Sequence, residues 1–317
     1  MTNSAPILRA LAALLLVLAL GVVFHGEGAF FRAQLHFDLL GALGAVGLCA
    51  LGQCLVILGG GIDLSVGAVV GLTGMVFAGL QLRAELPWPL ALAVALAVGA
   101  VVGLANGVLV ARLRVQPFLA TLATMVIARG LARFVPELAG AAASSRFLPQ
   151  GSEGPPFWTF LAGRLGPVPV TGILFATLAV VTAVWLQRSV FGRHLLATGA
   201  NAEAARLSGV ATGRVLTVTY VLAGVFAGLA GICQVARDVQ GNPSAGELLE
   251  LQTIAAVVIG GVSLQGGRGT LWLAILGVLI LGLLEKVLAL NGVPSHWRLV
   301  IQGAIILAAV LMQERRR

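Results

Sequence analysis

The sequence predicts an all-α membrane protein, a polytopic bundle of about ten transmembrane helices forming one domain over residues 1–317. Hydrophobic residues make up 59% of the chain and charged residues only 10%, and the mean hydropathy is +1.01. Soluble domains usually carry about 25% charged residues. The apolar residues also form long continuous runs, which indicate membrane helices and not the alternating strands of a barrel.

Each predicted span is an apolar run of the length that crosses a bilayer, and short polar breaks separate the runs. The first run follows Arg9 but offers no convincing small-residue cleavage site, so we expect a retained helix and not a secretory signal. In chain order the predicted spans are residues 7–24, 36–58, 63–82, 88–110, 117–135, 168–187, 215–234, 249–264, 270–289 and 298–313.

The arginines predict the orientation of this bundle, because short cytoplasmic loops collect Lys and Arg. With the N-terminus inside, both termini lie in the cytoplasm, and the loop 136–167, rich in Pro, Gly and Ser, faces outward. This topology explains the net charge of +8 better than nucleic-acid binding does. The arginines expected on the cytoplasmic side are Arg112, Arg114, Arg188, Arg193, Arg206, Arg214, Arg268, Arg315, Arg316 and Arg317.

The sequence contains no motif of a nucleotide-binding, metal-binding or hydrolytic site. Lys286 is the only lysine and no Gly-x-x-x-x-Gly-Lys run surrounds it, so the chain has no P-loop of its own. "GGRG" at residues 266–269 lacks the full spacing of a dinucleotide-binding turn. The cysteines predict inert buried thiols and the isolated histidines predict no metal site: Cys49, Cys54, Cys233, His25, His36, His194 and His296.

A glycine-rich break interrupts the apolar sequence at "ILGGGIDLSVGAVVGL", residues 57–72. The three consecutive glycines at 59–61 permit left-handed backbone angles, so we expect one helix to end and another to begin here. Asp63 and Ser65 then offer side-chain oxygens to the free N–H groups of the new helix, where its dipole also favours a carboxylate. An intramembrane carboxylate equally supports a direct role in transport or gating, and the two hypotheses are compatible.

A second break, "VVIGGVSLQGGRGTLW" at residues 257–272, resembles the first. Paired interruptions favour a transport site built on broken helices, although both breaks run in the same direction in the predicted topology. Ion-coupled secondary transport would need intramembrane carboxylates or histidines. Only Asp63 and Glu285 stand out as such candidates, so this alternative is disfavoured.

The loop at about 187–214 carries several arginines and the stretch "NAEAARLSGV". Asn201 is suited to cap a helix at its start and Gly209 to end it, so a short cytoplasmic helix is expected between them. Such a helix is either an inert connector or a docking element for a soluble partner.

Four stretches together resemble one known family. "GGIDLSVGAVVGLTGM", "PFLATLATMVIARGLA", "ATGANAEAARLSGV" and "ELLELQTIAAVVIGGVSLQGGRGT" are similar, in this order and over nearly the whole chain, to ribose-type permease subunits of bacterial ATP-binding cassette importers. The resemblance implies a dimeric subunit of the bacterial inner membrane that imports a sugar by ATP-driven alternating access. It also implies that this chain holds no cofactor, because a cytoplasmic ATPase binds ATP and magnesium, and that an extracytoplasmic binding protein delivers the substrate.

The resemblance also implies site residues. The loop would be the ATPase-coupling element, with Glu203 and Arg206 pairing across the interface and the small Ala204 and Ala205 allowing close approach. Its candidates are Gly199, Asn201, Glu203, Ala204, Ala205, Arg206, Ser208 and Gly209. A neutral sugar needs hydrogen-bonding groups, although each polar group can instead satisfy a neighbouring helix. The candidates for the translocation path or gating are Gln53, Gly60, Gly61, Asp63, Ser65, Asn106, Thr121, Thr124, Gln252 and Thr253.

The chain departs from the family pattern at "GLLEKVLALNG", where Glu285 and Lys286 stand in place of the usual uncharged residues. We expect both near the membrane edge, with Lys286 extended towards water. The substrate therefore stays open, and nucleosides or branched-chain amino acids are the alternatives to a sugar.

Overall fold

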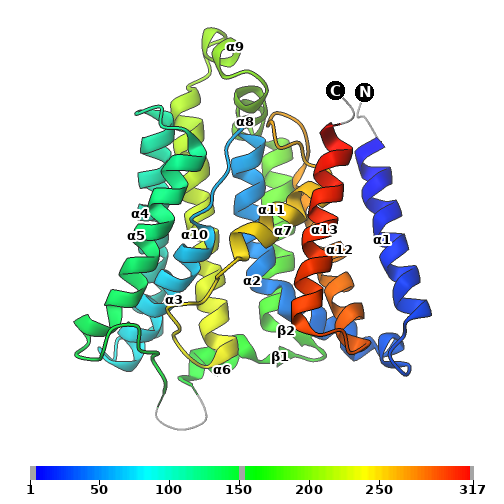
Figure 1. Cartoon of the computed structure of the whole chain (residues 1–317). Helices are drawn as coiled ribbons and strands as arrows, with labels where there is room; N and C mark the ends of the chain where they lie inside the picture. Colours follow the sequence, from blue (N-terminus) through cyan, green and yellow to red (C-terminus); the bar gives the residue numbers. More distant parts are fainter. Residues whose placement is uncertain (1–4, 150–153, 315–317) are drawn as a thin grey trace.

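The computed structural model of the chain describes residues 5–149 and 154–314, and these form a bundle of long helices (Figure 1). The all-α class is confirmed for this bundle. The described residues add a two-stranded hairpin, β1 (Arg164–Leu165) paired antiparallel with β2 (Val168–Pro169), and an isolated antiparallel bridge between Phe147 and Gly241. This hairpin leads into the next long helix.

Every predicted span coincides with a helix, because the residues that flank each apolar run favour the start or the end of a helix. Most bounds differ by no more than four residues: the span predicted at 63–82 begins three residues later, for example. The largest difference is at the span predicted at 249–264, which ends at Ile259. The helices are α1 (Ala5–Val23), α2 (Ala33–Leu58), α3 (Val66–Leu82), α4 (Trp88–Ala111), α5 (Pro117–Leu138), α7 (Val170–Arg188), α10 (Thr212–Asp238), α11 (Leu249–Ile259), α12 (Leu271–Leu290) and α13 (Ser295–Glu314).

Six of the described helices, namely α2, α4, α5, α7, α10 and α12, are long and apolar enough to cross a membrane. Three shorter apolar helices accompany them, at Ile7–Val23, Val66–Leu82 and Leu249–Ile259. These helices make the chain an integral, polytopic membrane protein.

Four shorter helices fill the connections, of which only the one after Asn201 was expected. They are η1 (Ala29–Phe31), α6 (Pro156–Ala162), α8 (Val190–Ala200) and α9 (Ala202–Leu207). The start of α8 is capped by Ser189, whose Oγ accepts a hydrogen bond from the N–H of Gly192 at 3.0 Å.

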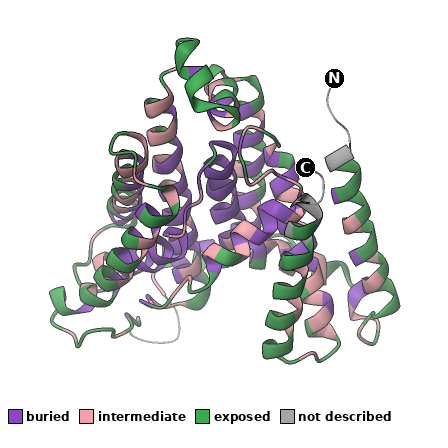
Figure 2. Cartoon of the chain, turned by 45° about the horizontal axis from the view of Figure 1, so that its top comes forward, coloured by how far each residue is buried: buried purple, intermediate pink, exposed green. Residues whose placement is uncertain are grey.

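Helix α10 lies at the centre of the bundle and packs closely along α4. A Cβ atom at Gly99, Gly103 or Gly107 of α4 would overlap backbone atoms of α10, so only glycine permits this approach. Figure 2 shows the result as a buried interior surrounded by exposed helix faces.

The two ends of the bundle differ in what they carry. Helix α1 begins and α13 ends at the end where α9 projects, whereas α6 and the hairpin lie at the opposite end (Figure 1). The predicted topology likewise puts the termini and the coupling loop on one side and the loop 136–167 on the other.

Candidate functional site

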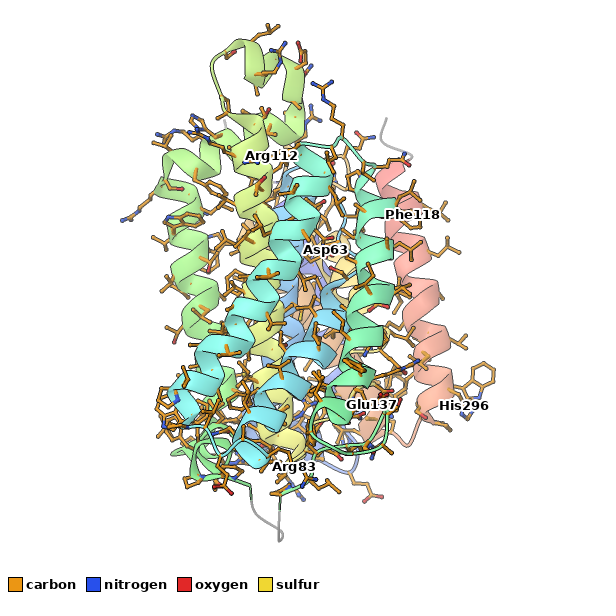
Figure 3. The ribbon with its side chains drawn as sticks, turned by 90° about the vertical axis from the view of Figure 1, so that its left-hand side faces the viewer. Asp63, Arg83, Arg112, Phe118, Glu137 and His296 are labelled. Atoms are coloured by element: carbon orange, nitrogen blue, oxygen red, sulfur yellow. The ribbon has the colours of Figure 1, made fainter. Side chains whose placement is uncertain are left out.

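The first glycine-rich break separates α2 from α3. After Leu58 the chain turns at Gly60, whose φ of 83° is left-handed and favours glycine. Gly61 does not adopt a left-handed angle, but its N–H donates to the Val56 carbonyl at 3.0 Å. The break then places Asp63 inside the bundle behind α4 and α5, as Figure 3 shows.

Asp63 starts a chain of buried hydrogen bonds. Its Oδ1 accepts from the backbone N–H of Ser65 at 2.8 Å and from Ser65 Oγ at 2.6 Å. Asp63 is 2% exposed and Ser65 1% exposed. Asp63 therefore closes a turn over Ser65, the residue that immediately precedes α3.

Helices α4 and α5 continue this chain. Asn106 of α4 donates from Nδ2 to Ser65 Oγ at 2.9 Å, and Thr124 of α5 donates to Asn106 Oδ1 at 2.6 Å. Thr121 of α5 donates to the Ile62 carbonyl at 3.3 Å. The break is thereby tied to two neighbouring helices, and we call Asp63, Ser65, Asn106 and Thr124 the buried polar chain.

Tyr220 of α10 lies beside this chain and was not among the residues predicted from the sequence. Its hydroxyl lies against Gly61 and has no hydrogen-bond partner, although the residue is only 1% exposed. It is the only tyrosine in the chain. No local sequence signal indicates this position, because the contact joins residues far apart in the sequence.

The second break packs directly on the first. The Gly267 N–H donates to the Leu58 carbonyl at 2.9 Å, which joins the loop after α11 to the end of α2. A Cβ at Gly266 would lie 2.7 Å from Cα of Gly60, so the two breaks meet backbone against backbone. The two breaks that resemble each other in the sequence are therefore in direct contact, which the sequence did not predict.

Gly199 completes this contact from the end of α8. A Cβ at Gly199 would overlap the carbonyl oxygen of Leu58 and approach the N–H of Gly267. We call Gly60, Gly199, Gly266 and Gly267 the glycine junction. It connects both breaks to the segment that leads into α9.

Helix α9 projects beyond the bundle at the tip of the loop after α8 (Figure 1). Asn201 caps it as predicted, with Oδ1 accepting from the Ala204 N–H at 2.9 Å, and Gly209 ends it with a left-handed φ of 85°. Leu207 is 74% exposed, and Ala205 is the one buried residue of the helix.

Two features of α9 concern the residues assigned to the coupling loop, and their pairing across an interface stays a prediction. Glu203 and Arg206 pair with each other within α9, through Arg206 Nε to Oε2 at 2.9 Å and Nη2 to Oε1 at 2.6 Å. The Arg206 guanidinium thereby holds the pKa of Glu203 below its ordinary value. Ala205 packs inward, so only Ala204 of the two alanines lies on the exposed face.

Two path candidates, Thr253 and Gln252, have their contacts away from the buried polar chain. Thr253 of α11 donates to the Glu250 carbonyl of its own helix at 2.9 Å. Gln252 lines a separate hollow between α11, α12 and α13, and Gln53 is fully buried in α2. Glu285 pairs with Arg298 of α13 at 3.6 Å, so it lies against a neighbouring helix.

The expectation that Asp63 and Glu285 are the only notable intramembrane carboxylates is also wrong. Glu250 lies in the first turn of α11, within the predicted span 249–264, and its Oε2 is buried. Arg129 lies near the middle of α5 and donates to backbone carbonyls of the chain before α11. Their proximity depends on packing between distant segments.

Comparison with known proteins agrees with the resemblance in the sequence. Residues 35–310 match the family model described as "Branched-chain amino acid transport system / permease component". The chain belongs to this permease family. No solved structure matches it.

The family includes curated proteins that cover nearly the whole chain. The ribose import permease protein RbsC of Escherichia coli strain K12 is 38% identical over 315 residues, which are 98% of this chain and 94% of that protein. RbsC of Bacillus subtilis strain 168 is 38% identical over 88% of this chain and 84% of that protein. The galactofuranose transporter permease protein YtfT of E. coli strain K12 is 38% identical over 92% and 82%.

Proposed function

We propose that the chain is the membrane-spanning permease subunit of an ATP-binding cassette importer that carries a neutral monosaccharide into a bacterial cytoplasm. The observation that carries this proposal is the 38% identity, over nearly the full length of both chains, to permeases named for ribose import. An exposed helix at a loop tip, joined by the glycine junction to both broken segments, supports it.

The number of membrane spans and the orientation of the bundle are part of the same proposal. Six long apolar helices, three shorter ones and α13 together give about ten spans. The arginine distribution puts the α9 end, with both termini, in the cytoplasm of a cell whose inner membrane holds the bundle. The loop 136–167 then faces the extracytoplasmic binding protein.

In this proposal α9 docks on a separate ATPase, which binds ATP and magnesium, and the chain pairs with a second permease copy. The exposed face of α9 contains both charges and an exposed leucine, the mixture expected of a transient protein interface. Closure of the ATPase would push α9, and α8 would carry that movement to Gly199.

The glycine junction explains how such a push would reach the translocation path. Backbone-to-backbone packing leaves no flexible side chain to absorb a displacement, so movement of Gly199 must shift Leu58 or Gly267. Leu58 begins the break that carries the buried polar chain. The two faces of the bundle would then open alternately as coupled rigid bodies.

Branched-chain amino acids remain the second candidate substrates, because the family model is described by their transport. The relatives that cover nearly the whole chain are named for sugars, which favours the sugar.

Uptake into vesicles tests the proposal. Vesicles would contain this chain, its ATPase and its binding protein, and the solutes would be radiolabelled pentoses, hexoses, nucleosides and leucine. We expect uptake of one monosaccharide that requires the ATPase and ATP. Uptake that persists without the ATPase would instead identify a secondary transporter, and leucine uptake alone would reassign the substrate.

A further inference from the structure

A hollow of about 610 Å³ opens on the bundle surface between the middle of α5 and the start of α11. Its polar lining consists of Arg129 and Arg133 from α5 and Glu247 and Glu250 from the α11 side. Ligand pockets are commonly about 300–1,000 Å³ in volume, so this hollow is large enough for a monosaccharide. We call it the Arg–Glu hollow.

The position of the charges along α5 is the first argument that this surface does not face lipid. Arg129 lies twelve residues after Pro117, which places it about 18 Å along a helix of 22 residues, near the middle of the membrane. A charged side chain at that depth on a lipid-facing surface is costly, and such residues usually line water or protein.

Helix α3 creates the space in which these charges are held. Arg129 Nη1 donates to the carbonyls of Pro243 at 2.9 Å and Ala245 at 2.7 Å, passing over Gly71 of α3. One turn earlier, a Cβ at Gly67 would overlap Glu250 Oε2. Two glycines on one face of α3 thus leave room for a guanidinium and a carboxylate.

Two features of the α11 side are unexplained by folding alone. Glu250 Oε2 is buried and has no hydrogen-bond partner. Leu248, which also lines the hollow, is held at a left-handed φ of 63°, a conformation that is unfavourable for a non-glycine residue. Strained backbone and unpaired polar atoms gather where a ligand completes the site.

The chemistry of the lining selects the ligand class. Two guanidinium groups offer only donors and two carboxylates offer only acceptors, whereas each sugar hydroxyl is both donor and acceptor. The four formal charges cancel, so the hollow has no net attraction for an anion or a cation. A neutral polyol can use both kinds of group through any of its hydroxyls, whereas a zwitterionic amino acid can use them only through its charged end; the relatives named for sugars favour the polyol.

We propose that the Arg–Glu hollow is a binding site for a neutral monosaccharide on the translocation path, with Glu250 accepting from a sugar hydroxyl and Arg133 donating to one. This inference rests on the proposed function, because it names the place in the permease where the transported sugar contacts the chain. The sequence-based path candidates do not include any of these four residues.

Cysteine accessibility at Gly130 tests it. Gly130 lines the hollow and a Cβ there meets nothing within 4 Å, so Gly130→Cys fits without displacing a neighbour. The matched control is Val101→Cys on α4, since Val101 is 63% exposed on an apolar helix face. The native cysteines are buried and give little background.

The assembled transporter in vesicles would be treated with a charged thiol reagent, with and without a panel of pentoses and hexoses. We expect the cysteine at 130 to react at least about tenfold faster than the one at 101, and the imported sugar to slow it severalfold while leucine does not. Equal, slow labelling of both positions would overturn the proposal, since the hollow would face lipid.

Two further outcomes would also overturn it. Oxidative cross-linking between cysteines at 130 of two copies, with no labelling, would show that a second permease copy covers the hollow. Labelling at 130 that no imported sugar slows would show water access without a binding site. Wild-type uptake is measured in the same vesicles, so failure of the importer proposal is visible separately.

Discussion

The buried polar chain and helix α9 both consist of hydrogen-bonded polar residues, but the first is buried in the bundle and the second is exposed. Around Asp63, buried polar groups from the break, α4 and α5 bond one another. In α9, Glu203 and Arg206 bond only within their own helix, and nearly every side chain is exposed. We therefore expect substitutions around Asp63 to change the stability of the fold, and substitutions in α9 to change ATP-dependent uptake without changing stability.

Among the test substitutions, controls apart, the largest change in stability is expected from Asp63→Ala. It removes the acceptor of both Ser65 hydrogen bonds and leaves two buried donors, which costs about 3 kcal/mol of unfolding free energy. Thermal unfolding of the purified permease in detergent measures this loss. Asp63→Asn is the matched control, because its Oδ1 still accepts, and its cost is expected near 1 kcal/mol.

Equal stability of the alanine and asparagine variants would contradict the proposed importance of the acceptor. It would also remove the basis for comparing this region with α9.

The next effect comes from glycines that lie on either side of the Arg–Glu hollow. Gly67→Ala drives a methyl group into the Gly246 carbonyl and Glu250, and overpacking of this kind costs about 2 kcal/mol. Gly130→Ala, its control on α5, meets only open space and replaces a helical glycine, so we expect a gain of about 0.5–1 kcal/mol. We expect the unfolding temperature to fall in Gly67→Ala and to rise in Gly130→Ala. A rise in Gly67→Ala would contradict the close packing of Gly67 against Gly246 and Glu250.

A smaller change is expected from Tyr220→Phe. The substitution removes a buried hydroxyl that has no hydrogen-bond partner, so stability rises by about 1 kcal/mol or stays unchanged. Tyr220→Ala is the control, since loss of the ring leaves a cavity and costs about 3–5 kcal/mol. A clear loss of stability in the phenylalanine variant would mean that the hydroxyl has a partner in the membrane.

Local sequence determines some of these regions and not others. The ends of α9 could be predicted because Asn201 and Gly209 act on their immediate neighbours. The break at Gly60 could be predicted for the same reason, and the long helices followed from apolar run length. Hydrogen-bonding side chains near the break could be selected as candidates for a transport path, because a neutral sugar needs such groups.

The Arg–Glu hollow could not be predicted in this way. Arg129 meets Glu250 only because Gly67 and Gly71 of α3 admit the chain before α11, a contact among three segments distant in the sequence. The pairing within α9 is a local feature of the sequence. Glu203 and Arg206 are three residues apart on a helix, where such ion pairs form.

The smallest change in stability, and the sharpest test of the comparison, is Arg206→Glu. The pair with Glu203 is exposed, so its loss should leave the unfolding temperature almost unchanged. If α9 docks on the ATPase, the same variant should lose ATP-dependent uptake at least about tenfold, because a charge reversal at an interface repels the partner. Uptake and co-purification of the ATPase measure this effect.

A charge swap separates docking from helix stability. Glu203→Arg combined with Arg206→Glu restores an ion pair inside α9 but leaves position 206 with the reversed charge. Recovered uptake in the double variant would mean that the pair only stabilises α9 and that the partner does not contact Arg206. Uptake that stays lost would mean that Arg206 acts on the partner. In that case the buried region and α9 are both folded, and the missing step is the transfer of the ATPase movement to α9.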